Sequence, residues 1–448
     1  MPTLARKLRA TDYFTLGWGT MVGVGWLVIM DDWLTRGGAL GTVLGFVIGG
    51  ALLFPIGWVY GKLVIAMPDA GGEIAYTSAV FPRSVSFATG WMMTLAYFIV
   101  CPWEAVAVGR IAASIFPALD SMQLYAVGGR PVFLPRLIVS LSLTALLTYL
   151  NYRGVRLSAT FQNWTSFGTL ALFVIFVLLG VSRGSAQHLA PLFTHSPLIS
   201  ILLVIQIVPY FMTGFESVGK AAEEANPEFR AGTFLTAIWM AILIGILFYA
   251  SIVATVAFVA PWRSLTSTRF MTAVAFQQAL GSRWIVNIIL AAALLSLFKC
   301  FNGNFVAASR LFFALGRRGM IAPRVGAIHI RNQTPSTAVL CVGSATAICM
   351  LLGDAILVPI TEVGSVASAI GWAATCAAFL AMTFRASTRK ASSNASLAGG
   401  AIAVLGLAVA IGLVLMKVVP IVPGHFTISE WIALAIWMLL CAAAALIN

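Results

Sequence analysis

Three ionisable residues stand inside stretches of the chain that are otherwise apolar: Glu104, Glu216 and Lys299. A charged side chain in such a stretch is costly unless it pairs, is neutralised or faces a polar cavity. Glu216 therefore suits a proton carrier or gate, or alternatively a cap that ties an opened helix backbone. For Glu104 and Lys299 we expect a pair at salt-bridge or water-bridged distance, which either couples movement to charge or fixes helix packing.

Glycine is concentrated in one apolar stretch, GWGTMVGVGW (17–26). Each glycine weakens a helix by about 1 kcal/mol relative to alanine, so this helix is expected to open near its middle. An opened membrane helix presents bare backbone amides, which suit an anionic group such as a carboxylate. Close packing of helices through small residues is the alternative interpretation.

A second break is predicted where Pro209 and Gly214 interrupt another apolar stretch, just before Glu216. If each half of the chain holds five helices, the two breaks fall on corresponding helices, the first and the sixth. Paired interruptions indicate a transporter built from inverted repeats, with its binding site at the middle of the membrane.

The composition is that of a membrane protein. Of the 448 residues, 60% are hydrophobic and 9% are charged, whereas a soluble domain carries about a quarter charged residues. Twelve stretches are long and apolar enough to cross a bilayer, and they must do so as helices. They cover 14–35, 39–64, 87–116, 133–150, 158–181, 197–219, 234–259, 284–314, 336–353, 357–384, 397–417 and 428–447.

The chain is predicted to form a single transmembrane domain over 1–448. It begins with a short cytoplasmic segment (1–13), followed by two five-helix repeats (14–181 and 197–384) and two further helices (397–447). A short helix on the outer face is expected within 260–283. No stretch alternates polar and apolar residues in the way a membrane-spanning strand requires.

The charges are distributed unevenly along the predicted helices. Lys and Arg number 27 and Asp and Glu 14, giving a net charge of +13. With the N-terminus inside, seventeen basic residues fall on the inner side and nine on the outer side. The positive-inside rule then predicts a multi-pass protein of the cell membrane with both termini cytoplasmic. The basic tracts at 6–9, 317–318 and 389–390 are interpreted as topology signals and contacts with anionic membrane lipid.

No motif for a metal, a cofactor or nucleic acid is found. The chain contains no zinc-binding spacing, nucleotide-binding glycine loop or nucleophile elbow. Its six cysteines are scattered through apolar stretches and are interpreted as buried apolar side chains.

Several motifs together resemble the amino acid–polyamine–organocation (APC) superfamily of permeases, which share the LeuT-type fold. The first break fits the G-x-G of that superfamily. PDAGGEIAYTSAVFP (68–82) resembles the loop after its second helix, and GFES and EEANP (214–217 and 223–227) resemble its sixth helix. SRLFFALGRRGMIAP (309–323) resembles the end of its eighth helix, with Arg318 where Asp is usual. The resemblance implies an all-α membrane protein with twelve helices, a 5+5 inverted repeat and discontinuous first and sixth helices.

The resemblance also implies a substrate site. The backbone amides of Gly23, Val24 and Gly25 are expected to hold a substrate carboxylate, and the broken sixth helix is expected to face its amino group. Aromatic rings beside the breaks are expected to cover the site and attract an ammonium group, with plain packing as the alternative. The remaining predicted lining residues are Trp26, Tyr210, Phe211, Thr213, Gly214 and Phe305.

Coupling to a proton or to sodium stays open. Many proton-coupled members of the superfamily carry a Lys in the fifth helix where this chain has Thr169. The alternatives are that Lys299 supplies a substitute charge, that the Thr169 hydroxyl helps to bind sodium, or that transport is exchange or facilitated uptake.

The predicted function is secondary active transport of an amino acid or related amine by alternating access. The alternatives are a non-transporting membrane receptor or sensor and a membrane-embedded enzyme on the same scaffold. The sequence leaves the solute and the oligomeric state open.

Overall fold

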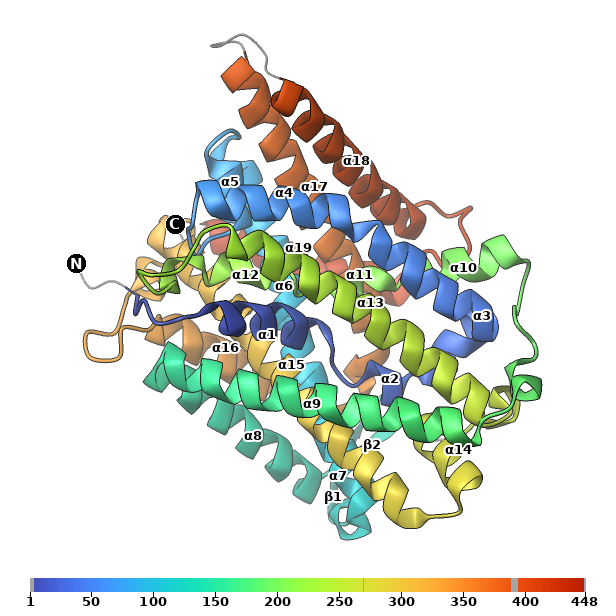
Figure 1. The fold of residues 1–448 in the computed structure, drawn as a ribbon. Helices are drawn as coiled ribbons and strands as arrows, with labels where there is room; N and C mark the ends of the chain where they lie inside the picture. The colour runs from blue at the N-terminus through green and yellow to red at the C-terminus, as the bar shows by residue number, and fades with distance from the viewer. Residues whose placement is uncertain (1–3, 269, 388–393, 447–448) are drawn as a thin grey trace.

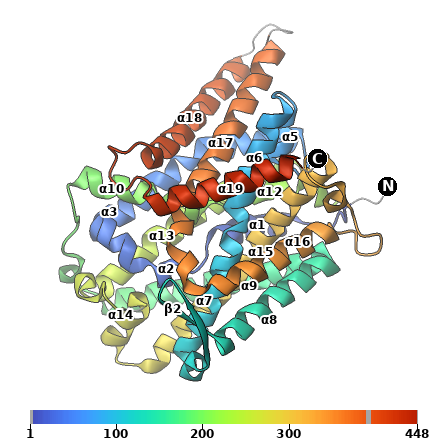
Figure 2. The same cartoon turned by 180° about the vertical axis from the view of Figure 1, so that it is seen from behind.

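The long apolar stretches fold into helices (Figures 1 and 2), while the number of twelve membrane-spanning helices stays a prediction. The computed structural model describes residues 4–268, 270–387 and 394–446. Over these residues, nine helices are long and apolar enough to span a membrane, and a tenth apolar helix is shorter. The two stretches with predicted breaks form shorter helices. The helix before the first break has 12 residues, and the first helix of the stretch that contains the second break has nine.

The first half of the chain contains nine helices within the described residues. One of them turns sharply at Gly38, where φ is 70°. A side chain at Gly38 would be strained in this conformation, and its Cβ would lie 2.6 Å from the carbonyl oxygen of Leu192. The helices are α1 (Ala10–Met21), α2 (Gly25–Val28), α3 (Met30–Ala51), α4 (Leu53–Ala66), α5 (Glu73–Ser78), α6 (Arg83–Phe98), α7 (Val100–Ile115), α8 (Leu134–Arg153) and α9 (Val155–Arg183).

The second half contains α10 to α19 and includes the short helix predicted within 260–283, which is α14. Its helices are α10 (Pro197–Ile205), α11 (Val208–Met212), α12 (Ser217–Lys220), α13 (Thr233–Val259), α14 (Met271–Leu280), α15 (Arg283–Arg317), α16 (Ser336–Cys349), α17 (Leu357–Ser387), α18 (Asn394–Val418) and α19 (Ile428–Leu446). Short 3-10 helices occur at η1 (Pro117–Asp120), η2 (Ala186–Leu189), η3 (Ala222–Glu224), η4 (Trp262–Leu265), η5 (Pro323–Gly326) and η6 (Met350–Ile356).

A small β-hairpin departs from the all-helical prediction. Strands β1 (Gln123–Val127) and β2 (Arg130–Phe133) pair antiparallel between α7 and α8. Gly128 and Gly129 form the turn with φ of 55° and 75°, the backbone region that tight hairpin turns require. The Tyr125 hydroxyl donates a hydrogen bond to the Leu351 carbonyl at 2.7 Å. The adjacent glycines at 128 and 129 are a local signal for this hairpin, which is too short to be a membrane-spanning strand.

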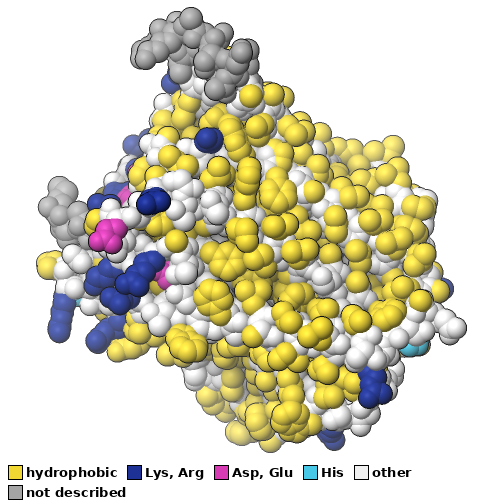
Figure 3. All heavy atoms as spheres, viewed as in Figure 1, with side chains coloured by type: hydrophobic (Ala, Val, Ile, Leu, Met, Phe, Trp, Pro, Cys, Tyr) yellow, Lys and Arg dark blue, Asp and Glu magenta, His cyan; other side chains and the backbone are white. Residues whose placement is uncertain are grey.

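The surface fits a protein that lies in lipid. In Figure 3, apolar side chains cover the broad middle of the face, while Lys and Arg side chains gather mainly toward the end where α1 begins. The start of α1 and the end of α19 lie at this same end of the molecule (Figures 1 and 2). The two ends of the described chain therefore lie on the same side of the molecule. The basic tract at 389–390 lies outside the described residues.

Ion pairs join the segments at the end that carries the termini. Arg310 of α15 binds a Glu224 carboxylate oxygen through Nε at 3.0 Å and Nη2 at 2.8 Å, and both side chains are buried. Lys220 binds Glu73 at 2.6 Å, also fully buried. The superfamily-like motifs after α4, after α12 and at the end of α15 are thus held against one another.

Arg318, the residue that departs from the superfamily pattern, joins this end of the molecule through an ion pair. It contacts the Asp69 carboxylate at 2.8 Å. Burial raises the pKa of Asp69, but the hydrogen bond and charge of Arg318 outweigh burial, so the pKa lies below its ordinary value. The Arg318–Asp69 contact is therefore an ion pair at neutral pH.

Breaking the Arg310–Glu224 pair should destabilise the fold strongly. Arg310→Met leaves Glu224 buried without its partner, at a cost of about 3–5 kcal/mol. The double variant Arg310→Met/Glu224→Gln leaves no unpaired charge and should regain most of this loss. The free energy of unfolding, or the melting temperature in detergent, measures the effect, with the exposed Arg331→Met as the matched control. Equal losses in the single and double variants would argue against a charge effect.

Candidate functional site

The first membrane-crossing segment opens at Val22, Gly23 and Val24, between α1 and α2. Val22 is extended, with φ −97° and ψ 98°. Backbone carbonyls near such an opening lack helical partners, and side chains of α15 replace those partners. Cys300 and Asn304 donate to the Thr20 carbonyl (3.1 and 3.0 Å), Ser296 donates to the Gly23 carbonyl (2.9 Å), and Lys299 donates to the Val22 carbonyl.

The second opening lies between α11 and α12. Gly214 has φ 143°, a conformation that side-chain-bearing residues rarely adopt. Glu216 accepts a hydrogen bond from the Gly214 amide at 3.1 Å and another from the Trp372 indole at 3.2 Å. These contacts fit the alternative interpretation, in which Glu216 caps the opened helix backbone. Its role in coupling stays a prediction.

The two openings meet. A Cβ at Gly214 would lie 2.6 Å from the backbone nitrogen of Met21, so the two stretches of backbone are in direct contact. The Tyr249 hydroxyl of α13 lies 3.1 Å from the carbonyl oxygen of Met21 and 3.1 Å from that of Phe211. Tyr249 thus bridges both openings. The sequence analysis missed it, because a Tyr within the apolar run of α13 resembles any packing residue.

A small cavity of about 20 Å³ lies where the openings meet. It has room for about one water molecule, so the helices must separate to admit a solute the size of an amino acid. The cavity brings together six residues from the predictions: Gly23, Gly25, Glu104, Tyr210, Phe211 and Thr213. Its other lining residues were not predicted: Thr20, Met21, Val100, Trp103, Cys300 and Asn304. Among these, the polar Asn304 within the apolar helix α15 was a signal that the sequence offered.

Glu104 and Lys299 both reach the first opening. A Cβ on Gly23 would overlap Oε1 of Glu104 and would lie 3.1 Å from the sulfur of Cys300, so the Glu104 carboxyl group lies against the first opening. The Lys299 ammonium lies 4.5 Å from the centre of the Trp18 ring. Glu104 and Lys299 are close enough for their charges to interact, yet no direct ion pair joins these two described residues. The pairing of Glu104 with Lys299 therefore stays a prediction.

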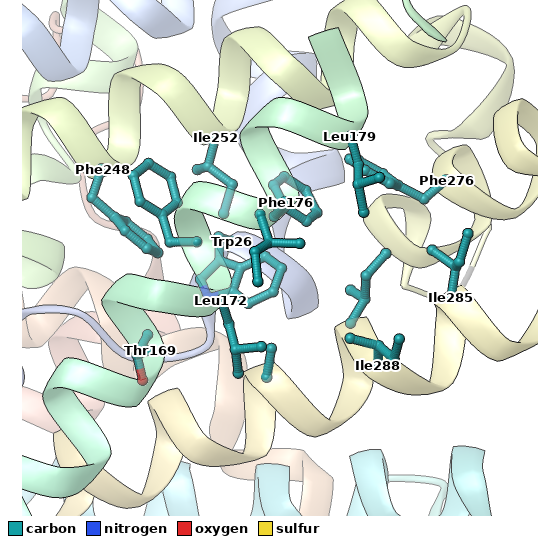
Figure 4. A pocket seen from close by; sticks show the side chains of 14 residues that line it. Trp26, Thr169, Leu172, Phe176, Leu179, Phe248, Ile252, Phe276, Ile285 and Ile288 are labelled. Atoms are coloured by element: carbon teal, nitrogen blue, oxygen red, sulfur yellow. The ribbon is translucent and has the colours of Figure 1, made fainter. Parts of the chain in front are cut away.

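Seven predicted residues do not line this cavity, and three of them (Trp26, Thr169 and Phe305) have other surroundings. Trp26 and Thr169 line a separate apolar pocket among α9, α13, α14 and α15 (Figure 4). The Thr169 hydroxyl donates to the Thr165 carbonyl of its own helix at 2.8 Å. Phe305 is fully buried, with its ring centre 6.4 Å from that of Phe301. Along the described chain, no group of His, Cys, Asp and Glu is arranged to hold a metal ion.

One protein family matches nearly the whole chain. The profile of the amino acid permease family covers residues 10–443. The chain belongs to this family. The resemblance to the APC superfamily is thereby confirmed, and this permease is a multi-pass membrane protein. The alternative of a membrane-embedded enzyme is wrong, because the family and the relatives are permeases and transporters.

Individual relatives are similar to the permease over most of their length. It is 22% identical over 391 residues to the amino-acid permease RocE of Bacillus subtilis, covering 82% of this chain and 79% of the relative. It is 23% identical over 366 residues to the branched-chain amino acid permease BcaP of the same species, covering 80% and 76%. A methylthioribose transporter of that species is 23% identical over 342 residues, covering 74% and 72%.

Proposed function

We propose that this permease moves an amino acid or a related amine across the cell membrane by alternating access, with the solute held between the two openings. The observation that supports this most strongly is the contact of the two opened backbones at Gly214 and Met21, beside a cavity with polar groups and aromatic rings. Paired openings suit a transporter because they offer backbone donors and acceptors at the depth where lipid offers none.

The proposed architecture has twelve transmembrane helices. Residues 14–181 and 197–384 form the two inverted repeats, and 397–447 forms the last two helices. The interrupted first and sixth helices correspond to the segments around α1–α2 and α10–α12. The end that carries the termini faces the cytoplasm, and its ion pairs hold that side closed in this conformation.

Within this proposal, the backbone at Gly23, Val24, Gly25 and Gly214 makes polar contacts with the solute. The side chains that line the cavity determine the shape of the site. Tyr210, Phe211 and Thr213 face the solute. Trp26 and Phe305 support the site from behind it.

We also propose that the Lys299 ammonium replaces a bound sodium ion at the end of α1. A cation beside the last carbonyls of a helix is stabilised by their partial negative charge, and Lys299 donates to the Val22 carbonyl there. The Thr169 hydroxyl is engaged within its own helix and is a weaker candidate for binding sodium. Transport is therefore expected to run on a proton gradient or by exchange.

Uptake into proteoliposomes tests the function. A panel of radiolabelled amino acids and amines should show saturable uptake of at least one amine-bearing solute, at the same rate when potassium replaces sodium. A methylthioribose arm is warranted because one relative is named for that solute. No saturable uptake across the panel would contradict the transporter and favour a receptor. Sodium-dependent uptake would contradict only the role given to Lys299.

A further inference from the structure

The first opening already faces a carboxylate that belongs to the protein. Glu104, on α7, is 2% exposed. A Cβ on Gly23 would overlap its Oε1 atom, so the carboxylate lies directly against the opened backbone. Glu104 therefore lies at the opening where the amides of Gly23, Val24 and Gly25 were expected to hold a substrate carboxylate.

The cavity contains unused acceptors and no cationic side chain. Oε2 of Glu104, Oδ1 of Asn304 and the Tyr210 hydroxyl are buried without a hydrogen-bond partner among the described residues. None of the described residues lining the cavity is Lys, Arg or His. Such a lining offers hydrogen-bond acceptors and one carboxyl group to a solute, but no basic side chain.

The nearest basic group makes its hydrogen bond and its ring contact outside the cavity. Lys299 does not line the cavity, and its ammonium is engaged by the Val22 carbonyl and the Trp18 ring. Glu216, the other buried carboxylate nearby, is occupied by the Gly214 amide and the Trp372 indole. Glu104 is therefore the charged group that faces the cavity.

A second carboxylate at the same amides would meet strong repulsion, since two like charges at contact distance cannot both stay ionised in a buried site. An ammonium group would instead pair with the free oxygen of Glu104. The rings of Trp103, Tyr210 and Phe211 line the same cavity, and aromatic faces attract ammonium groups.

We infer that Glu104 takes the place of the substrate carboxylate, and that the solute of this permease is a cationic amine without a carboxylate beside its ammonium group. This inference rests on the proposed transport function and narrows it to one class of solute. It revises the expectation that the Gly23–Gly25 amides bind a carboxylate of the solute.

Matched pairs of ligands test the inference. Equilibrium binding to the purified permease, and uptake into proteoliposomes, are measured for phenylalanine with 2-phenylethylamine, lysine with cadaverine, and leucine with 3-methylbutylamine. At least one amine should bind tighter than its parent amino acid by about tenfold or more. Tighter binding of the amino acid in every pair would overturn the inference and leave the transporter in place. No binding or uptake of either member of any pair would contradict the proposed function together with the inference.

Two variants of Glu104 distinguish charge from shape. Glu104→Gln keeps the size of the side chain and one acceptor oxygen but removes its charge. It should weaken amine binding by about tenfold or more. Glu104→Ala frees the opened amides, and should reverse the preference in favour of the amino acid of the same pair. Glu228→Gln, on an exposed loop, is the matched control. Amine affinity that is unchanged in Glu104→Gln would overturn the inference, and melting temperatures show whether each variant is folded.

Discussion

Gly25→Leu will abolish solute binding while the permease remains folded. A Cβ at this position would lie 2.6 Å from Cε1 of Phe211 and 3.1 Å from Cζ2 of Trp33. Phe211 cannot retreat easily, because its ring centre lies 4.8 Å from that of Trp33 and 6.2 Å from that of Tyr249. The leucine side chain must therefore displace Phe211 into the cavity or push the two openings apart.

The expected loss of affinity is on the order of 100-fold, equivalent to about 2.7 kcal/mol. Overpacking destabilises a folded protein by about 1–3 kcal/mol. The variant should therefore still be expressed and folded, with a somewhat lower melting temperature. Gly412→Leu on α18 is the matched control, because a Cβ there meets nothing within 4 Å. Binding of the transported solute to each purified variant is the measurement. Unchanged affinity in Gly25→Leu would show that the site lies elsewhere.

Lys299→Met will strongly impair transport. The variant keeps a long apolar side chain but removes the cation, so the Val22 carbonyl loses its donor and the charge of Glu104 loses its neighbour. Both groups are fully buried, where an unmet acceptor costs about 1–3 kcal/mol. We expect Lys299 to interact differently with the two conformations of the transport cycle. Its removal should therefore shift the equilibrium between them.

We expect initial uptake to fall by about tenfold or more. The matched control is Lys62→Met on α4, where the lysine is exposed. Uptake and counterflow exchange in proteoliposomes, together with the melting temperature, separate a lost transport step from a lost fold. A Lys299→Met variant that transports at the wild-type rate would refute the role of this ammonium.

The positions of both openings were predictable because the cost of a helix break is local. The glycines around Gly23 and the Pro209–Gly214 pair weaken a helix through their own backbone preferences. This effect does not depend on how the rest of the chain is packed. The apolar lengths of the helices and the motifs of the APC superfamily are local in the same way, and the family match confirms the resemblance to that superfamily. The Gly128–Gly129 turn is an equally local signal that was overlooked.

The composition of the cavity was only partly predictable, because it depends on how the helices are rotated and packed. Trp26 directly follows the first opening, yet its side chain points into an apolar pocket beside α9. Tyr249 and Asn304 sit in apolar helices that carry no motif, and they acquire a role only where α13 and α15 cross the openings.

By itself, the sequence determined a membrane permease with two interrupted helices, since apolar length and backbone propensity act within each segment. Tertiary structure alone decided that Gly214 abuts Met21 and that the α7 carboxylate lies against Gly23. Contacts between segments far apart in the chain depend on the packing of the whole bundle, and no local pattern encodes which atoms meet there.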